Sequence, residues 1–332
     1  MLLADALVRA GRENASTVHA LMRRALVFSA DRPGLYDGAA GLLVVIDAVD
    51  PRRSSLAQAR GQLRALLAAA IHNAPPPDAG DPDTYDLLYG VAGCALALRD
   101  DEPDALNAFL AYAERLADVV DERMAAPSRY RAVNLGVAHG IPGVLAALNA
   151  VCPRPHPLAR RYTDAILAMS HEVGGARRWG SLWEPRAVPS ARRAWCYQTV
   201  GVAAVLYDRA VLDGDDALRA LTVRAVDALL HGEKDGLGRF GPSLCHGRAG
   251  LATIAWHLAP EGERFVRTAR ALAEAVLGEY DEHRALGFRS DSADGVERID
   301  FLDGSFGIAL FLADAATGGA RGWLPLLGLL PD

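Results

Sequence analysis

The chain has 332 residues, which is long for a small domain but within the size of repeat-built and toroidal units. Apolar residues make up 51% of it and charged residues 23%. This composition excludes a disordered chain and, with many Leu and Ala residues, favours a helical globular protein. The net charge of −6 argues against a general nucleic-acid binder, because such a protein needs a basic surface to displace counterions from phosphates.

The first segment and the cysteines indicate the compartment. Residues 1–27 carry several charged side chains where a signal peptide would be apolar, and no apolar run approaches the roughly 20 residues that a membrane helix needs. The four cysteines are few and widely spaced, unlike a disulfide framework. They are Cys94, Cys152, Cys196 and Cys245. The sequence therefore predicts a cytoplasmic, reduced protein with no membrane insertion and no nucleic-acid partner.

A short glycine motif returns six times along the chain, and each copy leads into an apolar run. The last glycines of successive copies are separated by 49 to 58 residues, which indicates an internal repeat. The six copies are Gly38–Gly41, Gly90–Gly93, Gly140–Gly143, Gln198–Gly201, Gly247–Gly250 and Gly304–Gly307. The fourth copy begins with Gln198 where the other five have glycine.

Two kinds of helix are expected to alternate along this repeat. The runs after the glycines, such as 42–46 and 144–148, are apolar on all sides, so these inner helices must be surrounded by protein. The segments between them are amphipathic, with apolar residues at i, i+3, i+4 and i+7. These outer helices are expected at about 1–28, 55–73, 103–124, 157–173, 215–231 and 261–282.

Six inner helices that alternate with six outer ones predict an all-α fold, an α/α toroid or double α-barrel, as a single domain over residues 1–332. The loops before the inner helices all precede a glycine motif, so we expect them to gather on one face of the ring, where function is expected. The most informative of these loops cover residues 73–84, 177–195, 236–244 and 287–300.

Polar residues just before the inner helices should therefore converge on one pocket. They are Asp37, Asp86, His139, Cys196, Tyr197, Cys245, His246 and Asp303. Cys196 and Cys245 stand at equivalent positions, two residues before their motifs. With His246 they supply three ligands, the number that a catalytic zinc ion takes when one position stays open. Arg192 is a cation that would help to hold an incoming thiolate, and the other two cysteines are expected in the core.

The remaining pocket residues allow more than one interpretation. His139 is either a general acid or base near neutral pH or a histidine that bonds to backbone at a helix start. Asp86 could act in the pocket or cap its inner helix, and capping is the favoured role for Asp37 and Asp303. The loop 177–195, with five Arg and three Trp residues, is either a peptide-binding lip or a solvated loop with aromatic anchors.

At these residues the sequence resembles the lanthionine synthetase C-like family, the cyclases of lanthipeptide biosynthesis. The matching motifs span most of the chain and include the joint Trp-Cys-Tyr and Cys-His-Gly pair. They lie at residues 85–93, 134–143, 195–197, 244–251 and 301–310.

The resemblance implies a zinc-bearing double α-toroid that adds a peptide cysteine thiol across the double bond of dehydroalanine or dehydrobutyrine and so closes a thioether ring. Carried over position by position, the Zn²⁺ ligands are Cys196, Cys245 and His246. His139 is the acid that protonates the enolate, Asp86 is its partner in proton handling, and Arg192 and Tyr197 are pocket residues. The implied partners are a dehydrated precursor peptide and a dehydratase or kinase/lyase of the same pathway.

The chain departs from the family pattern beside one zinc ligand. After Trp-Cys-Tyr the family continues with Gly-x-Pro-Gly, whereas here Gln198 and Val200 replace the glycine and the proline. Zinc binding is still expected. Gln198 adds bulk and hydrogen-bonding capacity at the pocket rim, which bears on the identity of the substrate.

Other functions stay open at this point. A related enzyme would add a small thiol such as glutathione to dehydrated residues of a protein. A toroid with a vestigial site would serve as a peptide-binding scaffold. A carbohydrate-active toroid that uses paired carboxylates such as Asp37 and Asp303 fits less well, because it leaves Cys196, Cys245 and His246 without a role.

Overall fold

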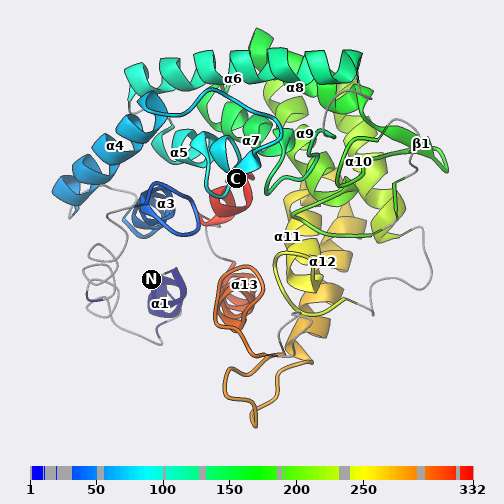
Figure 1. Ribbon diagram of the computed structural model, residues 1–332. Coiled ribbons are helices and arrows are strands. Elements are labelled where there is room, and N and C mark those ends of the chain that lie inside the picture. Colours follow the sequence, from blue (N-terminus) through cyan, green and yellow to red (C-terminus); the bar gives the residue numbers. More distant parts are fainter. Residues whose placement is uncertain are drawn as a thin grey trace.

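The computed structural model describes residues 2–9, 11, 20, 32–50, 56–99, 102–126, 132–184, 189–190, 192–231, 240–289, 296–318 and 322–331. Within these residues the inner ring of helices consists of α3 (Ala39–Val49), α5 (Val91–Leu98), α7 (Ile141–Val151), α9 (Thr199–Asp213), α11 (Arg248–His257) and α13 (Ser305–Thr317). Around it lie α4 (Ala57–His72), α6 (Pro103–Ala125), α8 (Pro157–Ala168), α10 (Asp216–Leu230) and α12 (Glu263–Leu277), as Figure 1 shows. The helix α1 (Leu2–Arg9) packs against α13 and α3 and so connects the last inner helix with the first. This is the predicted α/α toroid.

The repeated glycines have a steric reason. In all six copies, a Cβ at the last glycine would collide with the carbonyl oxygen of the residue six positions earlier in the chain. At Gly250, for example, the atom in the way is the oxygen of Leu244. The loop before each inner helix therefore folds back onto the first turn of that helix, and only glycine leaves room for this close approach.

Backbone hydrogen bonds connect these loops to one another around the ring. Each of the first five loops donates an N–H to a carbonyl of the loop before the next inner helix, at N···O distances of 2.7 to 3.3 Å. The pairs are Leu35 with Leu88, Leu87 with Ala138, Ala138 with Cys196, Cys196 with Cys245, and Cys245 with Leu302. Residues far apart in the sequence are thereby held side by side at one end of the ring.

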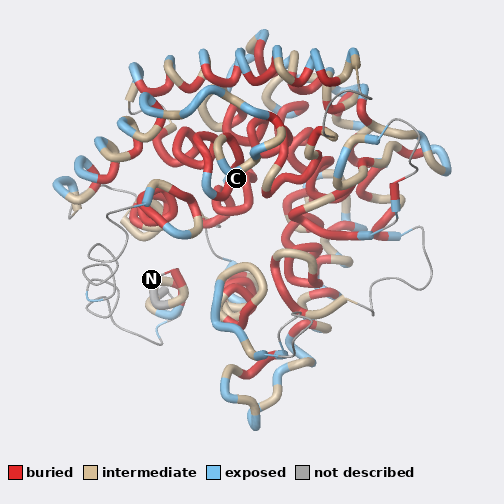
Figure 2. Tube along the Cα trace, viewed as in Figure 1, coloured by how far each residue is buried: buried red, intermediate tan, exposed pale blue. Residues whose placement is uncertain are grey.

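Burial distinguishes the two rings as the sequence predicts. All eight residues of α5 are buried, because the helix is enclosed on every side. In α6 only one stripe, which includes Phe109, Leu116 and Val120, is buried, and the opposite face is exposed. Figure 2 shows this contrast between the enclosed inner helices and the half-exposed outer ones.

The C-terminal segment fills the centre of the ring (Figure 1). Its short 3-10 helix η4 (Leu324–Leu327) packs against α3, and the indole N–H of Trp195 donates to the carbonyl of Leu327 at 2.7 Å. The hydroxyl of Tyr36 donates to the carbonyl of Leu326. Because Trp195 precedes Cys196 directly, the segment supports the loop that carries this cysteine.

One outer helix is shorter than predicted. The helix expected over 157–173 ends at Ala168, and β1 (His171–Val173) pairs in antiparallel register with β2 (Ala176–Arg178). The turn between the strands consists of Gly174 and Gly175, whose φ angles of 62° and 78° suit a tight hairpin. The amphipathic pattern continued past the end of the helix because a short strand also alternates buried and exposed residues.

Two further 3-10 helices, η1 (Pro82–Thr84) and η3 (Ala259–Glu261), complete the described elements. Most of the helix expected over 1–28, and parts of the loops 177–195, 236–244 and 287–300, lie outside the described residues. None of the described helices combines the length and the apolar character needed to cross a membrane.

Candidate metal centre

The three predicted ligands come together at the starts of α9 and α11. The ligand atoms of Cys196, Cys245 and His246 all lie within 4.8 Å of one another, and we call these residues the sulfur group. Ligand atoms around a tetrahedral zinc ion with bonds of about 2.1–2.3 Å lie about 3.4–3.8 Å apart. Two thiols and one imidazole therefore fit a zinc ion with small adjustments, and the donor set leaves a fourth position for a substrate.

The two thiols of the sulfur group do not share their protons equally. The hydrogen bond from Cys245, followed by contact with His246, lowers the pKa of Cys196. The same hydrogen bond to Cys196, together with burial, raises the pKa of Cys245. The positive charge of Arg192 favours the thiolate form of both residues. The group thus favours the thiolate form at Cys196, which suits the binding of a cation.

Asp303 has a different role from the predicted one. The helix α13 begins at Gly304 without a side-chain capping bond, and the carboxylate of Asp303 lies 3.5 Å from Nδ1 of His246. A carboxylate beside a metal-binding imidazole fixes its orientation and increases its basicity. Asp37 does not cap α3 either, and instead pairs with Arg32 at 3.0 Å. The prediction of two helix caps is therefore wrong.

Asp86 and His139, which we call the acid group, form a hydrogen-bonded pair. Oδ2 of Asp86 lies 2.6 Å from Nδ1 of His139. The other oxygen of this fully buried carboxylate accepts the backbone N–H groups of Tyr89 and Gly90 at 2.7 and 2.9 Å. Asp86 therefore fixes the turn that leads into α5 and holds the histidine, but it does not cap the helix, whose first residues make no side-chain capping bond. The contact with Asp86 engages Nδ1 of His139, so Nε2 is the ring nitrogen that Asp86 leaves available.

The environment of His139 favours its protonated form. The hydrogen bond that His139 donates to Asp86 raises the pKa of His139 and outweighs the opposing effect of burial, with smaller contributions from the charges of Asp86, Asp83 and Cys196. Asp83 is exposed, and one of its carboxylate oxygens lies within 4.8 Å of the ligand atoms of Asp86 and His139. A histidine held in this way can act as a general acid near neutral pH.

Two tyrosine rings flank His139. The ring of Tyr197 lies 6.2 Å from the imidazole, centroid to centroid, and the ring of Tyr89 lies 6.1 Å away at an interplanar angle of 29°. A Cβ on Gly136 would press on the ring of Tyr197 at 2.6 Å, so this glycine makes room for it. Tyr89 is part of the 85–93 motif, but its contact with His139 could not be predicted, because a tyrosine at a helix start has no distinctive pattern.

The other predicted residues lie outside this group or touch it only through charge. Cys94 is buried in the core, where its thiol faces the carbonyl of Pro33 at 3.7 Å, and Cys152 lies just after α7 at the opposite end of that helix from His139. Both fit the predicted structural role. Arg192 is exposed and acts on the sulfurs through its positive charge.

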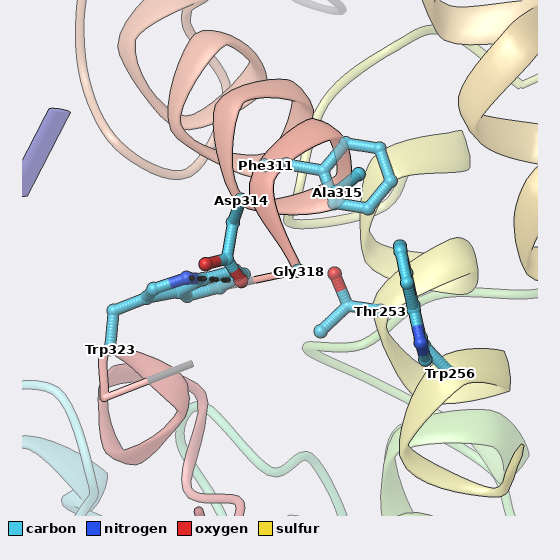
Figure 3. A pocket seen from close by; sticks show the side chains of 7 residues that line it. All are labelled: Thr253, Trp256, Phe311, Asp314, Ala315, Gly318 and Trp323. Atoms are coloured by element: carbon cyan, nitrogen blue, oxygen red, sulfur yellow. Dashed lines mark hydrogen bonds between the residues drawn. The ribbon is translucent and has the colours of Figure 1, made fainter. Parts of the chain in front are cut away.

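A separate cavity of about 150 Å³ lies between the C-terminal parts of α11 and α13. It is lined by Thr253, Trp256, Phe311, Asp314, Ala315, Gly318 and Trp323, and Figure 3 shows Asp314 accepting the indole N–H of Trp323 at 3.2 Å. Because Cys245 and His246 precede the N-terminus of α11, this cavity lies at the other end of the ring from the metal centre.

The fold and the site together define a helical toroid with a three-ligand group and a histidine–carboxylate pair at one mouth. The family model described as "Lanthionine synthetase C-like protein" matches residues 3–327. The chain therefore belongs to the lanthionine synthetase C-like family.

Comparison with solved structures supports the same fold. A structure titled "Nisin cyclase" is similar to this chain with a TM-score of 0.70 over 94% of this chain and 84% of that chain, at 16% sequence identity. At this identity the likeness concerns the fold alone. No curated protein sequence matches the chain.

Proposed function

We propose that this protein is a zinc-dependent lanthipeptide cyclase, which adds cysteine thiols of a dehydrated precursor peptide to dehydroalanine or dehydrobutyrine and forms thioether rings. The observation that carries the proposal is the joint presence, at one mouth of the ring, of the sulfur group and the acid group. Membership of the lanthionine synthetase C-like family supports a peptide substrate. A dehydratase or a kinase/lyase of the same pathway would supply the dehydrated residues.

The sulfur group would hold the metal ion. Cys196, Cys245 and His246 would occupy three positions, and Zn²⁺ bound there would keep a substrate thiol deprotonated yet nucleophilic at neutral pH. Asp303 would orient His246. The guanidinium of Arg192 would offset the negative charge that three thiolates bring together.

The acid group would complete the addition. The substrate sulfur forms a bond to the β-carbon of the dehydrated residue, and the electron pair of the double bond moves toward the carbonyl to give an enolate. Protonated His139 then transfers its Nε2 hydrogen to the α-carbon. The proton lost by the substrate thiol balances the one delivered. Asp86 keeps the imidazole oriented and stabilises its cationic form until it is reprotonated from solvent.

The experiment uses a synthetic peptide with one cysteine and one dehydroalanine, incubated with the zinc-loaded protein. Cyclisation leaves the mass unchanged and removes the free thiol, so thiol labelling followed by mass spectrometry gives the result. Cys245→Ala should leave the thiol free, and Cys152→Ala, a cysteine outside the site, should behave as the unmodified protein. A mass increase equal to glutathione, when that thiol is added, would favour intermolecular addition instead. Persistence of the thiol with both the synthetic and the cognate peptide would contradict the proposal.

A further inference from the structure

Gln198 has a backbone conformation that is unusual for its residue type. It is the residue that begins α9, with φ at 71° and ψ at −163°. Among the described residues that are not glycine, only Arg99 also has a positive φ. The region that Gln198 occupies is populated almost exclusively by glycine, because a Cβ there meets the backbone. Such strain persists only where other interactions offset it.

The other inner helices explain how the strain arises. All five begin at a glycine with a negative φ and extended ψ, for example Gly140 at −129° and −176°. A Cβ on these glycines would collide with backbone, at Gly140 with the carbonyl oxygen of Asn134 and at Gly247 with the N–H of Ser243. Gln198 carries a Cβ, and its backbone is rotated into the region of positive φ instead.

The side chain of Gln198 makes two contacts that offset this strain. Its Oε1 accepts the hydroxyl of Ser190 at 2.9 Å, and its Nε2 donates to the hydroxyl of Ser181 at 3.5 Å. The residue is 9% exposed, so these hydrogen bonds are shielded from water. Both serines belong to residues 181–195, the part of the loop 177–195 that we call the lip from here on. Residues 185–188 and 191 of the lip lie outside the described part of the chain.

Ser190 is hydrogen-bonded to the segment before Cys196, and Ser181 to the segment before His139. The hydroxyl of Ser190 accepts the backbone N–H of Arg192 at 3.3 Å. The carbonyl of Ser181 accepts the N–H of Leu135 at 2.9 Å, in the segment that leads to His139. The side chain of Arg192 is exposed, and its backbone is held from two sides, by the bond to Ser190 and by the buried Arg193, which donates to the carbonyl of Leu229 at 2.6 Å.

We propose that Gln198 is a positioning residue that clamps Ser181 and Ser190, near the two ends of the lip, to the start of α9 and thereby orders the backbone at Arg192. The inference rests on the proposed function, in which Arg192 balances the charge of the bound thiolates. A glycine at position 198 would relax the backbone but leave the lip unclamped. The cost of the strained backbone at Gln198 is thus offset by hydrogen bonds that order the segment carrying Arg192.

Three variants separate the strain from the clamp. Gln198→Ala removes both side-chain hydrogen bonds and keeps the strain, whereas Gln198→Gly removes the bonds and the strain. We expect the Gly variant to unfold about 2 °C above the Ala variant, because only glycine fits this backbone without cost. Equal unfolding temperatures would overturn the strain argument. Ser190→Ala breaks the bond toward Arg192 and leaves residue 198 unchanged.

Hydrogen exchange of the Arg192 amide tests the clamp without turnover. We expect exchange about fivefold to tenfold faster in Gln198→Ala, Gln198→Gly and Ser190→Ala than in the unmodified protein, because the hydrogen bonds that order this amide are lost. Gln198→Glu keeps an acceptor for Ser190 and should restore the slow exchange. Ser170→Ala, a serine outside the lip that bonds to Leu167, is the matched control and should have no effect. Unchanged exchange in all three clamp variants would overturn the proposal.

Turnover of the dehydrated peptide gives the second measurement. With the lip loosened, KM should rise by about threefold to tenfold with a smaller change in kcat, because Arg192 would contribute to binding of the substrate thiolate. Zinc content should stay at one ion per chain in each variant. Faster exchange in a protein that never cyclises a peptide would support the clamp and contradict the proposed function. A proportional loss of kcat with unchanged KM would contradict the role assigned to Arg192.

Discussion

The sulfur group and the acid group differ in how their polar atoms are satisfied. Asp86 in the acid group is fully buried, and its two oxygens face two backbone N–H groups and the imidazole of His139. The two thiols of the sulfur group form a hydrogen bond with each other. As a result the pKa of Cys196 is lowered and the pKa of Cys245 is raised. The acid group is complete without a ligand, whereas the sulfur group gains most from a divalent cation.

This difference predicts that substitutions in the acid group affect both stability and activity, whereas substitutions in the sulfur group affect mainly metal binding. Asp86 holds the turn before α5 and also orients the histidine, so its loss should affect both folding and function. The sulfur group caps no helix by hydrogen bonds that the structure describes, and its loss should affect metal binding with little effect on the fold. Four variants test this contrast, from the largest expected effect to the smallest.

Removal of one thiol should have the largest effect. Cys245→Ala leaves two of the three proposed ligands, and we expect loss of stoichiometric zinc and a fall in turnover of more than about 10³-fold. Metal analysis after gel filtration and thiol labelling of the peptide measure both quantities. The circular dichroism spectrum should stay helical. Cys94→Ala is the control in the core, and zinc retained by Cys245→Ala would contradict the ligand assignment.

Replacement of the acid should separate the two groups. In His139→Gln we expect turnover to fall by about 10²–10⁴-fold, the range that a general acid supplies, because no proton donor remains for the enolate. Zinc content should be unchanged, since His139 is not in the sulfur group. Single-turnover kinetics with the dehydroalanine peptide measure the rate. A variant that cyclises at the original rate would mean that the proton comes from solvent.

Asp303→Asn tests the carboxylate beside His246. Loss of this partner should weaken zinc binding by about 10–100-fold, because the imidazole is then less basic and less firmly oriented. Competition against a chromogenic chelator measures the affinity. Asp37→Asn removes an equivalent residue that pairs with Arg32 instead, and it should leave the affinity unchanged. Equal affinities for both variants would assign Asp303 a structural role.

The sequence predicts the ring and the identity of the sulfur group because the repeat superimposes distant residues. Once Cys196 and Cys245 occupy the same repeat position, the hydrogen-bonded loops of the toroid bring them together. The contact between Asp303 and His246 could not be predicted, because an Asp before a helix equally suits a cap. The positive φ of Gln198 could not be predicted either. The sequence shows that a glycine of the repeat is replaced, but not how the backbone adjusts to the new side chain.

The smallest expected effect is on the pH dependence of activity, which tests how the charges near His139 set its pKa. The pKa of His139 is raised, chiefly by Asp86, so activity should decline as the pH rises through that pKa and the acid form disappears. The contribution of this histidine to stability has the same sign. It is complete below the pKa of histidine in the unfolded chain and is lost as the pH rises through the pKa of His139 in the folded protein.

The exposed Asp83 makes a smaller contribution to the raised pKa of His139. Asp83→Asn should therefore move the alkaline limb of kcat slightly to lower pH and leave the rate at low pH unchanged. The exposed Asp81, two residues away, is not among the charges that act on His139, so Asp81→Asn should leave the limb in place. A shift of the same size in both variants would mean that net charge, rather than the local field, controls the acid.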